Sequence, residues 1–291
     1  MRPGGAQTRV KLTILGDYLK QFAKASGRSW HRYYIDGFAG CGQGVDPRSG
    51  NTYDGSARLC FDVEPPFTRC FLIENNPLRA AMLDEISRER RNAEVIRGDV
   101  NERIAYVLRK AEPQAATFAF LDPEGTELHW STVRRLAEHK RGQPFKVELL
   151  ILFPLQMCVL RLLNFKTGLV PKVHEEKLEQ MLGAESPWRD IWRMRLLGEI
   201  TTPEETRAAF LDAYCHQLKS LGYAHVLARE VVSDDGRPLY YLVFASDHDA
   251  GKRIMRHEFA ASQMEPGQLF NAAEYTTGVI YDPDEERPYR Y

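Results

Sequence analysis

A short apolar run that closes on an aspartate and continues as a glycine-rich loop is the most constraining feature of this chain. Residues 33–44 read Tyr-Tyr-Ile-Asp-Gly-Phe-Ala-Gly-Cys-Gly-Gln-Gly, with glycine at positions 37, 40, 42 and 44. Glycine adopts positive φ readily and carries no Cβ, so a strand can turn sharply here and its backbone N–H groups can approach an adenosyl ligand. The loop therefore predicts a buried strand followed by a site for a nucleotide-type cofactor.

The composition indicates a protein with a substantial core and no strong charge bias. The chain has 291 residues, 27% of them charged, and a formal net charge of −1. One large domain is expected at this length. The chain is not basic overall, so its net charge does not indicate a nucleic-acid partner, although a local basic face is still possible. The five cysteines form no Cys-x-x-Cys pair, which favours reduced thiols in a cytosol and argues against a zinc site or another metal centre.

The sequence contains no candidate for a membrane span. Its longest apolar stretch, residues 149–153, is far shorter than the roughly 20 residues that cross a bilayer. The first residues also lack the apolar core of a secretion signal. We therefore expect a cytoplasmic protein that makes no contact with a membrane.

Apolar runs alternate with helical patterns through the first half of the chain. Nearly continuous apolar strands in alternation with helices are typical of a parallel sheet that is covered on both faces. Such a sheet binds its ligand at the carboxyl ends of the strands. The strands are predicted at 33–36, 68–74, 93–96, 117–121 and 147–153, and helices among others at about 11–25 and 77–90.

Four acidic residues stand at or just after the ends of consecutive predicted strands. They are Asp36, Glu74, Asp99 and Asp122. The carboxyl ends of parallel strands meet at one edge of a sheet, so these side chains are expected to lie along the same edge. That edge is the candidate functional site.

The second half of the chain begins with a helical insertion, expected at about 164–201. The segment 202–205, Thr-Pro-Glu-Glu, then predicts the start of a helix, because Thr202 can cap it and Glu205 can complete a capping box. Gly222 is expected to end this helix.

The last part of the chain predicts a β-hairpin followed by a helix. Strands at 224–232 and 238–245 flank Asp234-Asp235-Gly236, and an Asp-Gly turn between two such runs is typical of antiparallel pairing. A helix is expected from about residue 249, and a frayed tail from residue 282. We interpret the whole chain, 1–291, as a single domain.

This arrangement resembles the class I S-adenosylmethionine-dependent methyltransferases, whose α/β fold is a Rossmann-like mixed sheet of seven strands, parallel except for a C-terminal hairpin. In that family an acidic and glycine-rich loop after the first strand wraps the methionine end of the cofactor. An acid that ends the second strand binds the ribose hydroxyls, and an acid after the third lies beside the adenine amino group. The resemblance implies S-adenosylmethionine as cofactor, bound by Asp36, Gly37, Phe38, Ala39, Gly40, Gly42, Glu74, Asn75, Asp99 and Val100.

The chemistry of these acids agrees with such roles, although plainer interpretations stay open. A carboxylate has two acceptor oxygens for two vicinal hydroxyls, and an exocyclic amine needs an acceptor. Glu74 could instead favour the start of the next helix through the helix dipole, and Gly98-Asp99 could be an ordinary turn. A nicotinamide-dependent oxidoreductase is a further alternative, but its Gly-x-Gly-x-x-Gly spacing is absent, because position 45 is valine.

More narrowly, the chain resembles the three-Cys-motif partner (TcmP) family of bacteria and phages. The resemblance covers roughly residues 10–262 and lies in Tyr-Ile-Asp-Gly-Phe-Ala-Gly, Gly55-Ser56, Phe-Leu-Asp-Pro-Glu-Gly and Tyr-Leu-Val-Phe-Ala-Ser-Asp-His. It implies a methyltransferase-like fold and a partner, a separate three-cysteine-motif protein encoded nearby. The family's substrate is unsettled, so the resemblance names no methyl acceptor.

The segment Asp122-Pro123-Glu124-Gly125 is the candidate catalytic centre, because the fourth strand of this fold ends opposite the transferable methyl group. Enzymes that methylate adenine amines carry Pro-Pro and an aromatic residue here, whose ring stacks on the base. This chain departs from that pattern at Glu124 and Gly125, which puts base N-methylation in doubt. Glu124 could act as general base toward a hydroxyl or amine, or the segment could be only an acidic turn.

The function predicted from the sequence is methyl transfer from S-adenosylmethionine to an unknown acceptor, with nucleic acid favoured. The alternative is a non-catalytic accessory subunit that binds cofactor or nucleic acid and serves the three-cysteine partner. Basic clusters at 88–91 and 134–141 could contact phosphates, but interleaved acids make a solvated helix face the better interpretation.

Overall fold

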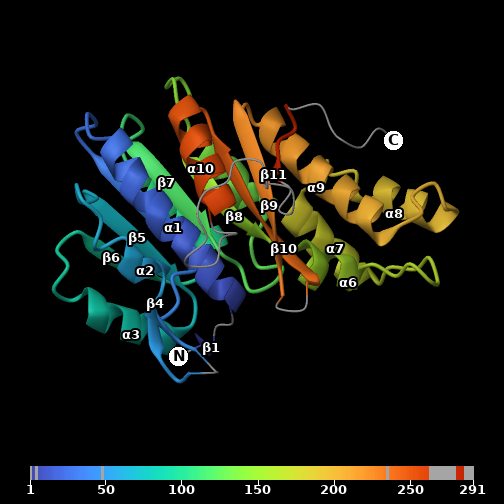
Figure 1. The fold of residues 1–291 in the computed structure, drawn as a ribbon, viewed down its shortest axis with the longest axis horizontal. Helices are drawn as coiled ribbons and strands as arrows, with labels where there is room; N and C mark the ends of the chain where they lie inside the picture. The colour runs from blue at the N-terminus through green and yellow to red at the C-terminus, as the bar shows by residue number, and fades with distance from the viewer. Residues whose placement is uncertain (1, 4–5, 47–48, 234–235, 262–279, 285–291) are drawn as a thin grey trace.

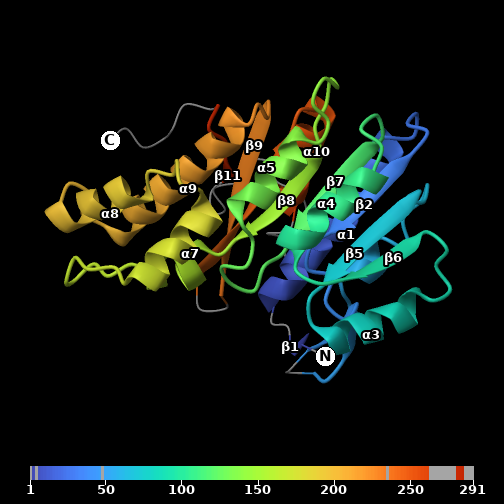
Figure 2. The same cartoon turned by 180° about the vertical axis from the view of Figure 1, so that it is seen from behind.

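A large sheet runs through the molecule, and helices cover both of its faces (Figure 1). The computed structural model describes residues 2–3, 6–46, 49–233, 236–261 and 280–284. A turn of 180° brings the second helical layer to the front (Figure 2). The predicted α/β class is confirmed.

The strands of the sheet follow the order β11-β9-β10-β8-β7-β2-β5-β6. Five of them, from β8 to β6, pair in parallel. β10 lies between β8 and β9 and is antiparallel to both. The strands span β2 (Arg32–Asp36), β5 (Arg69–Glu74), β6 (Ala93–Arg97), β7 (Ala116–Leu121), β8 (Glu148–Phe153), β9 (His225–Val232), β10 (Pro238–Ser246) and β11 (Ile280–Tyr281).

The strand order confirms the predicted class I methyltransferase (Rossmann-like) fold, with one correction to the strand count. We expected seven strands, and the described residues contain eight in this sheet, because the two-residue β11 pairs antiparallel with β9. A separate small sheet with the order β1-β3-β4 lies beside the glycine-rich loop. It consists of β1 (Arg2–Pro3), β3 (Gln43–Val45) and β4 (Thr52–Asp54).

Helices α1 (Ala6–Ala25) and α10 (Asp249–Ala261) cover the face seen in Figure 1, and α4 (Val100–Lys110), α5 (Trp130–Glu138) and α9 (Pro203–Ser220) cover the face seen in Figure 2. The remaining helical segments are α2 (Ser56–Leu59), α3 (Pro77–Ser87), a π-helical turn (Leu155–Val159), α6 (Leu160–Leu162), α7 (Lys172–Leu182) and α8 (Trp188–Leu197).

The apolar strands are explained by this double cover. Successive side chains of a strand point to opposite faces of the sheet. Tyr34 accordingly belongs to the buried cluster that contains Leu15 of α1, whereas Ile35 belongs to the cluster that contains Ile104 of α4. A strand buried on both faces therefore reads as a continuous apolar run instead of an alternating one.

Polar residues cap α3 and α9, which begin where the sequence predicted, although α3 ends at Ser87 and not near residue 90. The Asn76 side chain accepts from the backbone N–H groups of the first turn of α3 at 3.0 and 3.1 Å. Thr202 and Glu205 form the expected capping box at the start of α9. Gly222 follows that helix with φ at +89°, a conformation that glycine adopts without strain.

The segment expected to form a helical insertion contains α7 and α8. Trp188 is only 1% exposed and lies in the same buried cluster as the strands and α9. Trp192 is partly buried, and its Nε1 donates to the carbonyl of Asn164 at 3.1 Å. Both tryptophans therefore pack inward, which attaches the insertion to the core of the main sheet.

The C-terminal hairpin forms as predicted, but the start of the tail does not. The antiparallel pairing of β9 and β10 is confirmed, whereas Asp234 and Asp235 of its turn lie outside the described residues. The frayed tail expected from residue 282 does not begin at Asp282. That residue is buried, and its carboxylate pairs with Lys252 Nζ of α10 at 2.6 Å. Residues 285–291 lie outside the described part of the chain.

Candidate cofactor and acceptor site

The glycine-rich loop after β2 is held by backbone hydrogen bonds to the two neighbouring strands. The N–H of Gly37 donates to the carbonyl of Phe120 in β7, and the N–H of Ala39 donates to that of Ile73 in β5, each at 2.9 Å. Gly40 and Gly42 have φ values of +64° and +76°, which L residues rarely adopt. A Cβ added at Gly40 would meet no atom within 4 Å, so the loop presents bare backbone to open space.

Asp36 supports this loop from beneath. It is fully buried and accepts hydrogen bonds from the N–H of Phe38 and the hydroxyl of Tyr34, both at 3.2 Å. The hydroxyl of Ser56, which is the first residue of α2, also bonds to it. Burial raises the pKa of Asp36 to about 7. All of these hydrogen bonds are to the protein itself. Asp36 therefore holds the loop in place, whereas we expected from the sequence that it would bind the cofactor.

Glu74 joins the end of β5 to the same loop. One carboxylate oxygen accepts from the N–H of Gly40 at 2.8 Å, and the other accepts from the N–H of Asn76 at 2.7 Å. The side chain is only 6% exposed. Each oxygen has a second lone pair beyond these bonds, so the carboxylate retains acceptor capacity.

Asp99 caps α4, and its Oδ1 accepts from the N–H of Asn101 at 2.7 Å. The residue is half-buried and lies two positions after Arg97, the last residue of β6. Asn75 is exposed, and Val100 is buried, where it would meet a Cβ placed on Gly37 at 3.2 Å. Val100 is therefore a packing residue under the loop.

A cavity of about 740 Å³ lies at the carboxyl ends of β2, β7 and β8. Ligand cavities in proteins are typically about 300–1,000 Å³. It brings together the predicted residues Phe38, Ala39, Gly40, Gly42, Asp122, Pro123 and Glu124. It does not include Asp36, Gly37, Glu74, Asn75, Asp99 or Val100 in its lining, and of these Asp36, Gly37 and Glu74 support it from behind.

Two ion pairs cross this cavity. Lys11 Nζ of α1 lies 2.5 Å from Asp122 Oδ2, and both side chains are largely buried. Arg79 of α3 lies 2.6 Å from Glu124 Oε1 in a more exposed position. Two cations thus balance the two carboxylates of the Asp-Pro-Glu segment. The arrangement can accept hydrogen bonds from an amine or hydroxyl, and can exchange a pairing cation for a substrate donor.

The sequence interpretation missed Lys11, Arg79 and Tyr240, which all line the cavity. Lys11 Nζ also lies 5.9 Å from the centre of the Tyr240 ring. The available sequence signal for Lys11 was its spacing of three and four residues from Ile14 and Leu15, which places it on the apolar stripe of the helix. In the structure it is only 9% exposed. No local pattern distinguishes Arg79 or Tyr240, because their neighbours at the cavity come from distant segments.

Within the described ranges no group of three or more His, Cys, Asp or Glu side chains could hold a metal ion. The five cysteines form no disulfide. In the same described part, no helix combines the length and apolarity that a membrane crossing requires.

Comparison with known proteins supports the fold and gives no family. No protein-family profile matches the sequence, and no curated protein matches it either. Among solved structures, protein LPL1258 of Legionella pneumophila, of the family DUF519, is similar with a TM-score of 0.53 at 11% identity. The match covers 95% of this chain and 98% of that one. At this identity the similarity concerns the fold alone.

Two further structures have lower similarity. TYW2 of M. jannaschii in complex with AdoMet has a TM-score of 0.34 at 12% identity, over 79% of this chain and 75% of that one. Spermidine synthase in complex with the transition-state analogue AdoDATO has a TM-score of 0.41 at 9% identity, over 93% and 69%.

Proposed function

We propose that this protein is an S-adenosylmethionine-dependent methyltransferase. The observation that carries the proposal is the cavity of about 740 Å³, because it joins the glycine loop to the Asp-Pro-Glu segment at the carboxyl edge of a class I sheet. Ligands of open α/β sheets bind at this edge. The bound cofactor would supply an electrophilic methyl group on a sulfonium.

The residues present fit such a cofactor. The open space beside Gly40 lets a ligand approach the loop backbone, where a larger residue would place a side chain. We assign Gly40 and Gly42 to the methionine portion, Glu74 to the ribose hydroxyls and Asp99 to the adenine amine. Glu74 lies behind the lining of the cavity, bonded to the loop at Gly40, and Asp99 lies at the start of α4.

Methyl transfer is an in-line displacement, so the protein contributes mainly positioning. Asp122 and Glu124 would accept hydrogen bonds from the nucleophile and orient it toward the methyl group. Glu124 is the better general base of the two, because it is 46% exposed whereas Asp122 is 18% exposed and paired with Lys11. Release of Arg79 from Glu124 would free the carboxylate to take the proton.

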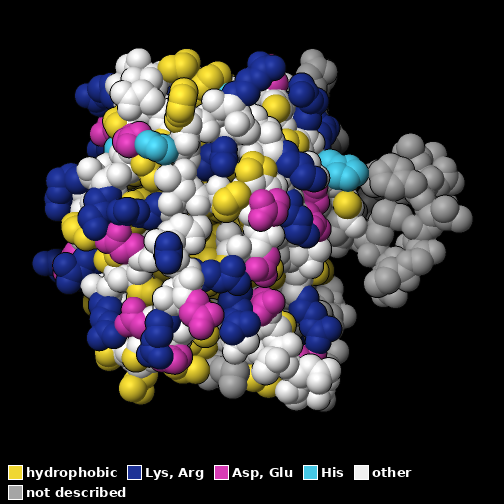
Figure 3. All heavy atoms as spheres, turned by 90° about the vertical axis from the view of Figure 1, so that its left-hand side faces the viewer, with side chains coloured by type: hydrophobic (Ala, Val, Ile, Leu, Met, Phe, Trp, Pro, Cys, Tyr) yellow, Lys and Arg dark blue, Asp and Glu magenta, His cyan; other side chains and the backbone are white. Residues whose placement is uncertain are grey.

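Nucleic acid is the acceptor that we propose. Lys11 and Arg79 place positive charge beside the cavity, where each could pair with a phosphate once displaced from its carboxylate. The neighbouring surface supplies less. Figure 3 shows Lys and Arg interleaved with Asp and Glu on this side of the molecule, and Arg88, Arg90 and Arg97 each form an ion pair with an acid.

The finer identity that we propose is membership of the TcmP family, with a three-cysteine-motif protein as partner in the cytoplasm. Its support is the set of motifs quoted above, of which Phe38-Ala39-Gly40 and Asp122-Pro123-Glu124 both line the cavity. Five cysteines without a disulfide agree with a reducing compartment.

One experiment tests this function directly. Purified protein is incubated with methyl-labelled S-adenosylmethionine and with cellular RNA, DNA or protein, with and without the neighbouring three-cysteine-motif protein. We expect label in a nucleic-acid fraction, and less of it with a Glu124→Gln variant. Binding of the cofactor by calorimetry with no label in any fraction would contradict catalysis.

A second candidate function is a non-catalytic accessory subunit. It is favoured by the ion pairs that occupy both Asp122 and Glu124, together with the missing Pro-Pro-aromatic segment. Such a subunit would bind cofactor or nucleic acid and transfer nothing. Label that appears only when the partner is present, and that persists in the Glu124→Gln variant, would favour this alternative.

A further inference from the structure

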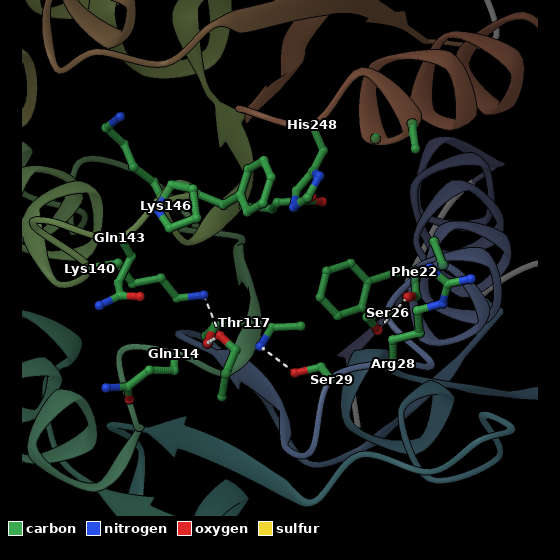
Figure 4. Close-up of a pocket in the computed structure, with 18 of the residues that line it drawn as sticks. Phe22, Ser26, Arg28, Ser29, Gln114, Thr117, Lys140, Gln143, Lys146 and His248 are labelled. Atoms are coloured by element: carbon green, nitrogen blue, oxygen red, sulfur yellow. Dashed lines mark hydrogen bonds between the residues drawn. The ribbon is translucent and has the colours of Figure 1, made fainter.

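A second cavity, of about 660 Å³, lies at the opposite edge of the sheet. Figure 4 shows that its lining residues come from the end of α1, the start of β7, the segment 140–146 and the start of α10. Thr117 in β7 lines this cavity, whereas Asp122, just after β7, lines the first one. A strand of this length spans about 20 Å, so the two cavities are separate sites.

A buried lysine marks the inner part of this second cavity. Lys140 is only 5% exposed, and its Nζ donates to the carbonyl of Ala115. Figure 4 shows the side chain extending from the segment 140–146 toward the start of β7. An ammonium has three donors, and among the described residues only the carbonyl of Ala115 accepts a hydrogen bond from it.

The positive charge of Lys140 has no ion-pair partner at contact distance among the described residues. Burial lowers its pKa to about 8, so the amine is still mostly protonated at neutral pH. Buried charges in proteins are normally paired, because an unpaired charge loses its hydration without compensation. The buried ammonium of Lys140 therefore lacks a counter-ion, and a bound anion would supply one.

Glu148 is the acidic residue whose charge acts on Lys140, but the two side chains do not form an ion pair. Its carboxyl group accepts from the hydroxyls of Tyr18 and Ser246, and burial raises its pKa to about 7. Burial therefore favours the protonated, uncharged form of this carboxyl group near neutral pH. Its attraction for Lys140 acts from beyond ion-pair distance.

The walls of the cavity are mainly apolar and aromatic. Phe22 and Ile254 contribute from α1 and α10, and Phe145 stacks on His248 with ring centroids 3.5 Å apart. Burial lowers the pKa of His248, which keeps its ring uncharged at neutral pH. Arg28 adds an exposed positive charge to the lining. A flat apolar body between such walls would replace water at low cost.

We propose that this cavity is a second ligand site, which binds a small aromatic carboxylate with its anionic group on Lys140 and its ring between α1 and α10. The site is independent of the proposed methyl transfer, because no residue lines both cavities.

The test uses 2-naphthoate as the carboxylate probe and 2-naphthalenemethanol as its uncharged analogue, each titrated by calorimetry into the intact protein at neutral pH. A buried charge-assisted hydrogen bond contributes about 1.5–3 kcal/mol, so we expect naphthoate to bind at least about tenfold more tightly than the alcohol. Lys140→Met keeps the length of the side chain and removes its charge, and it should abolish this preference.

Arg141→Met is the matched control, because Arg141 is the adjacent residue and its side chain is 81% exposed. It should bind both probes as the wild type does. Phe145→Ala removes an exposed wall and should weaken both probes about threefold or more, even if Lys140→Met does not fold. Absence of saturable naphthoate binding by the wild type, an unchanged preference in Lys140→Met, or unchanged binding in Phe145→Ala would each overturn the proposal.

Discussion

Replacement of Glu74 by glutamine tests the link between the glycine loop and the cofactor. Both carboxylate oxygens of Glu74 face backbone N–H donors, those of Gly40 and Asn76. Glutamine has the same shape, but one of its terminal atoms is an amide nitrogen. Whichever way that amide is turned, one donor then faces another donor.

The structure gives the expected magnitude. A hydrogen bond to a charged acceptor contributes about 1.5–3 kcal/mol, and the bonds here are buried, so we expect a loss of about 2 kcal/mol in the free energy of unfolding. With an entropy of unfolding of about 2.1 cal/mol/K per residue, this corresponds to a fall in Tm of roughly 3 °C for a chain of 291 residues. If the same carboxylate also binds the ribose, the affinity for S-adenosylmethionine should fall about 30-fold, which is the same free energy expressed as binding.

Calorimetric titration of the cofactor and thermal melting measure the two effects separately. Arg134→Ala is the control, because Arg134 forms an exposed pair with Glu185 at 3.6 Å, and such pairs contribute little. Equal affinities of Glu74→Gln and Arg134→Ala for the cofactor would refute the ribose assignment. A fall in Tm with unchanged affinity would leave Glu74 as an anchor of the loop only.

Three further predictions concern single residues. Glu124→Gln should leave cofactor affinity unchanged and lower single-turnover methyl transfer about 100-fold, and unchanged turnover would remove it from the mechanism. Thr202→Ala should cost about 1 kcal/mol in urea unfolding because the capping box of α9 is lost, whereas the exposed Ser131→Ala should cost nothing measurable. Burial raises the pKa of Asp36 to about 7 from 3.8, so the folded protein keeps a proton that the unfolded chain loses, and stability decreases as pH rises between these values. Asp36→Asn should therefore reduce the loss of stability between about pH 5 and about pH 8 by on the order of 2 kcal/mol relative to wild type, and an effect no larger than that of the exposed Asp62→Asn would contradict the burial of this charge.

The strands and helix ends were predictable because their signals are local. Continuous apolar runs follow from burial on both faces, and the caps at Asn76 and Thr202 use side chains that bond within three residues. The strand β11 was missed, because two residues carry no periodicity. Its place at the sheet depends on contacts with β9 and α10.

The candidate site was predictable in part for the same reason. The glycine loop and the Asp-Pro-Glu segment each have a recognisable sequence, and the order of parallel strands brings them to one edge. The pairing of Lys11 with Asp122 joins residues 111 positions apart, and that of Arg79 with Glu124 joins residues 45 positions apart. No local sequence pattern reveals contacts between residues so far apart in the chain, because these contacts depend on how the helices pack against the sheet.

The buried Asp282 has a consequence for the behaviour of the molecule in concentrated solution. The outermost strand of a sheet offers unsatisfied backbone groups to any neighbour and can seed polymerisation. Here the bond between Asp282 and Lys252 fastens β11 over the middle of β9, opposite Ala228 and Arg229. The strand at the other edge of the sheet, β6, carries the charged Glu94 and its ion pairs, which disfavour pairing with a further strand. Features at both edges of the sheet therefore disfavour edge-to-edge strand pairing with another copy of the chain.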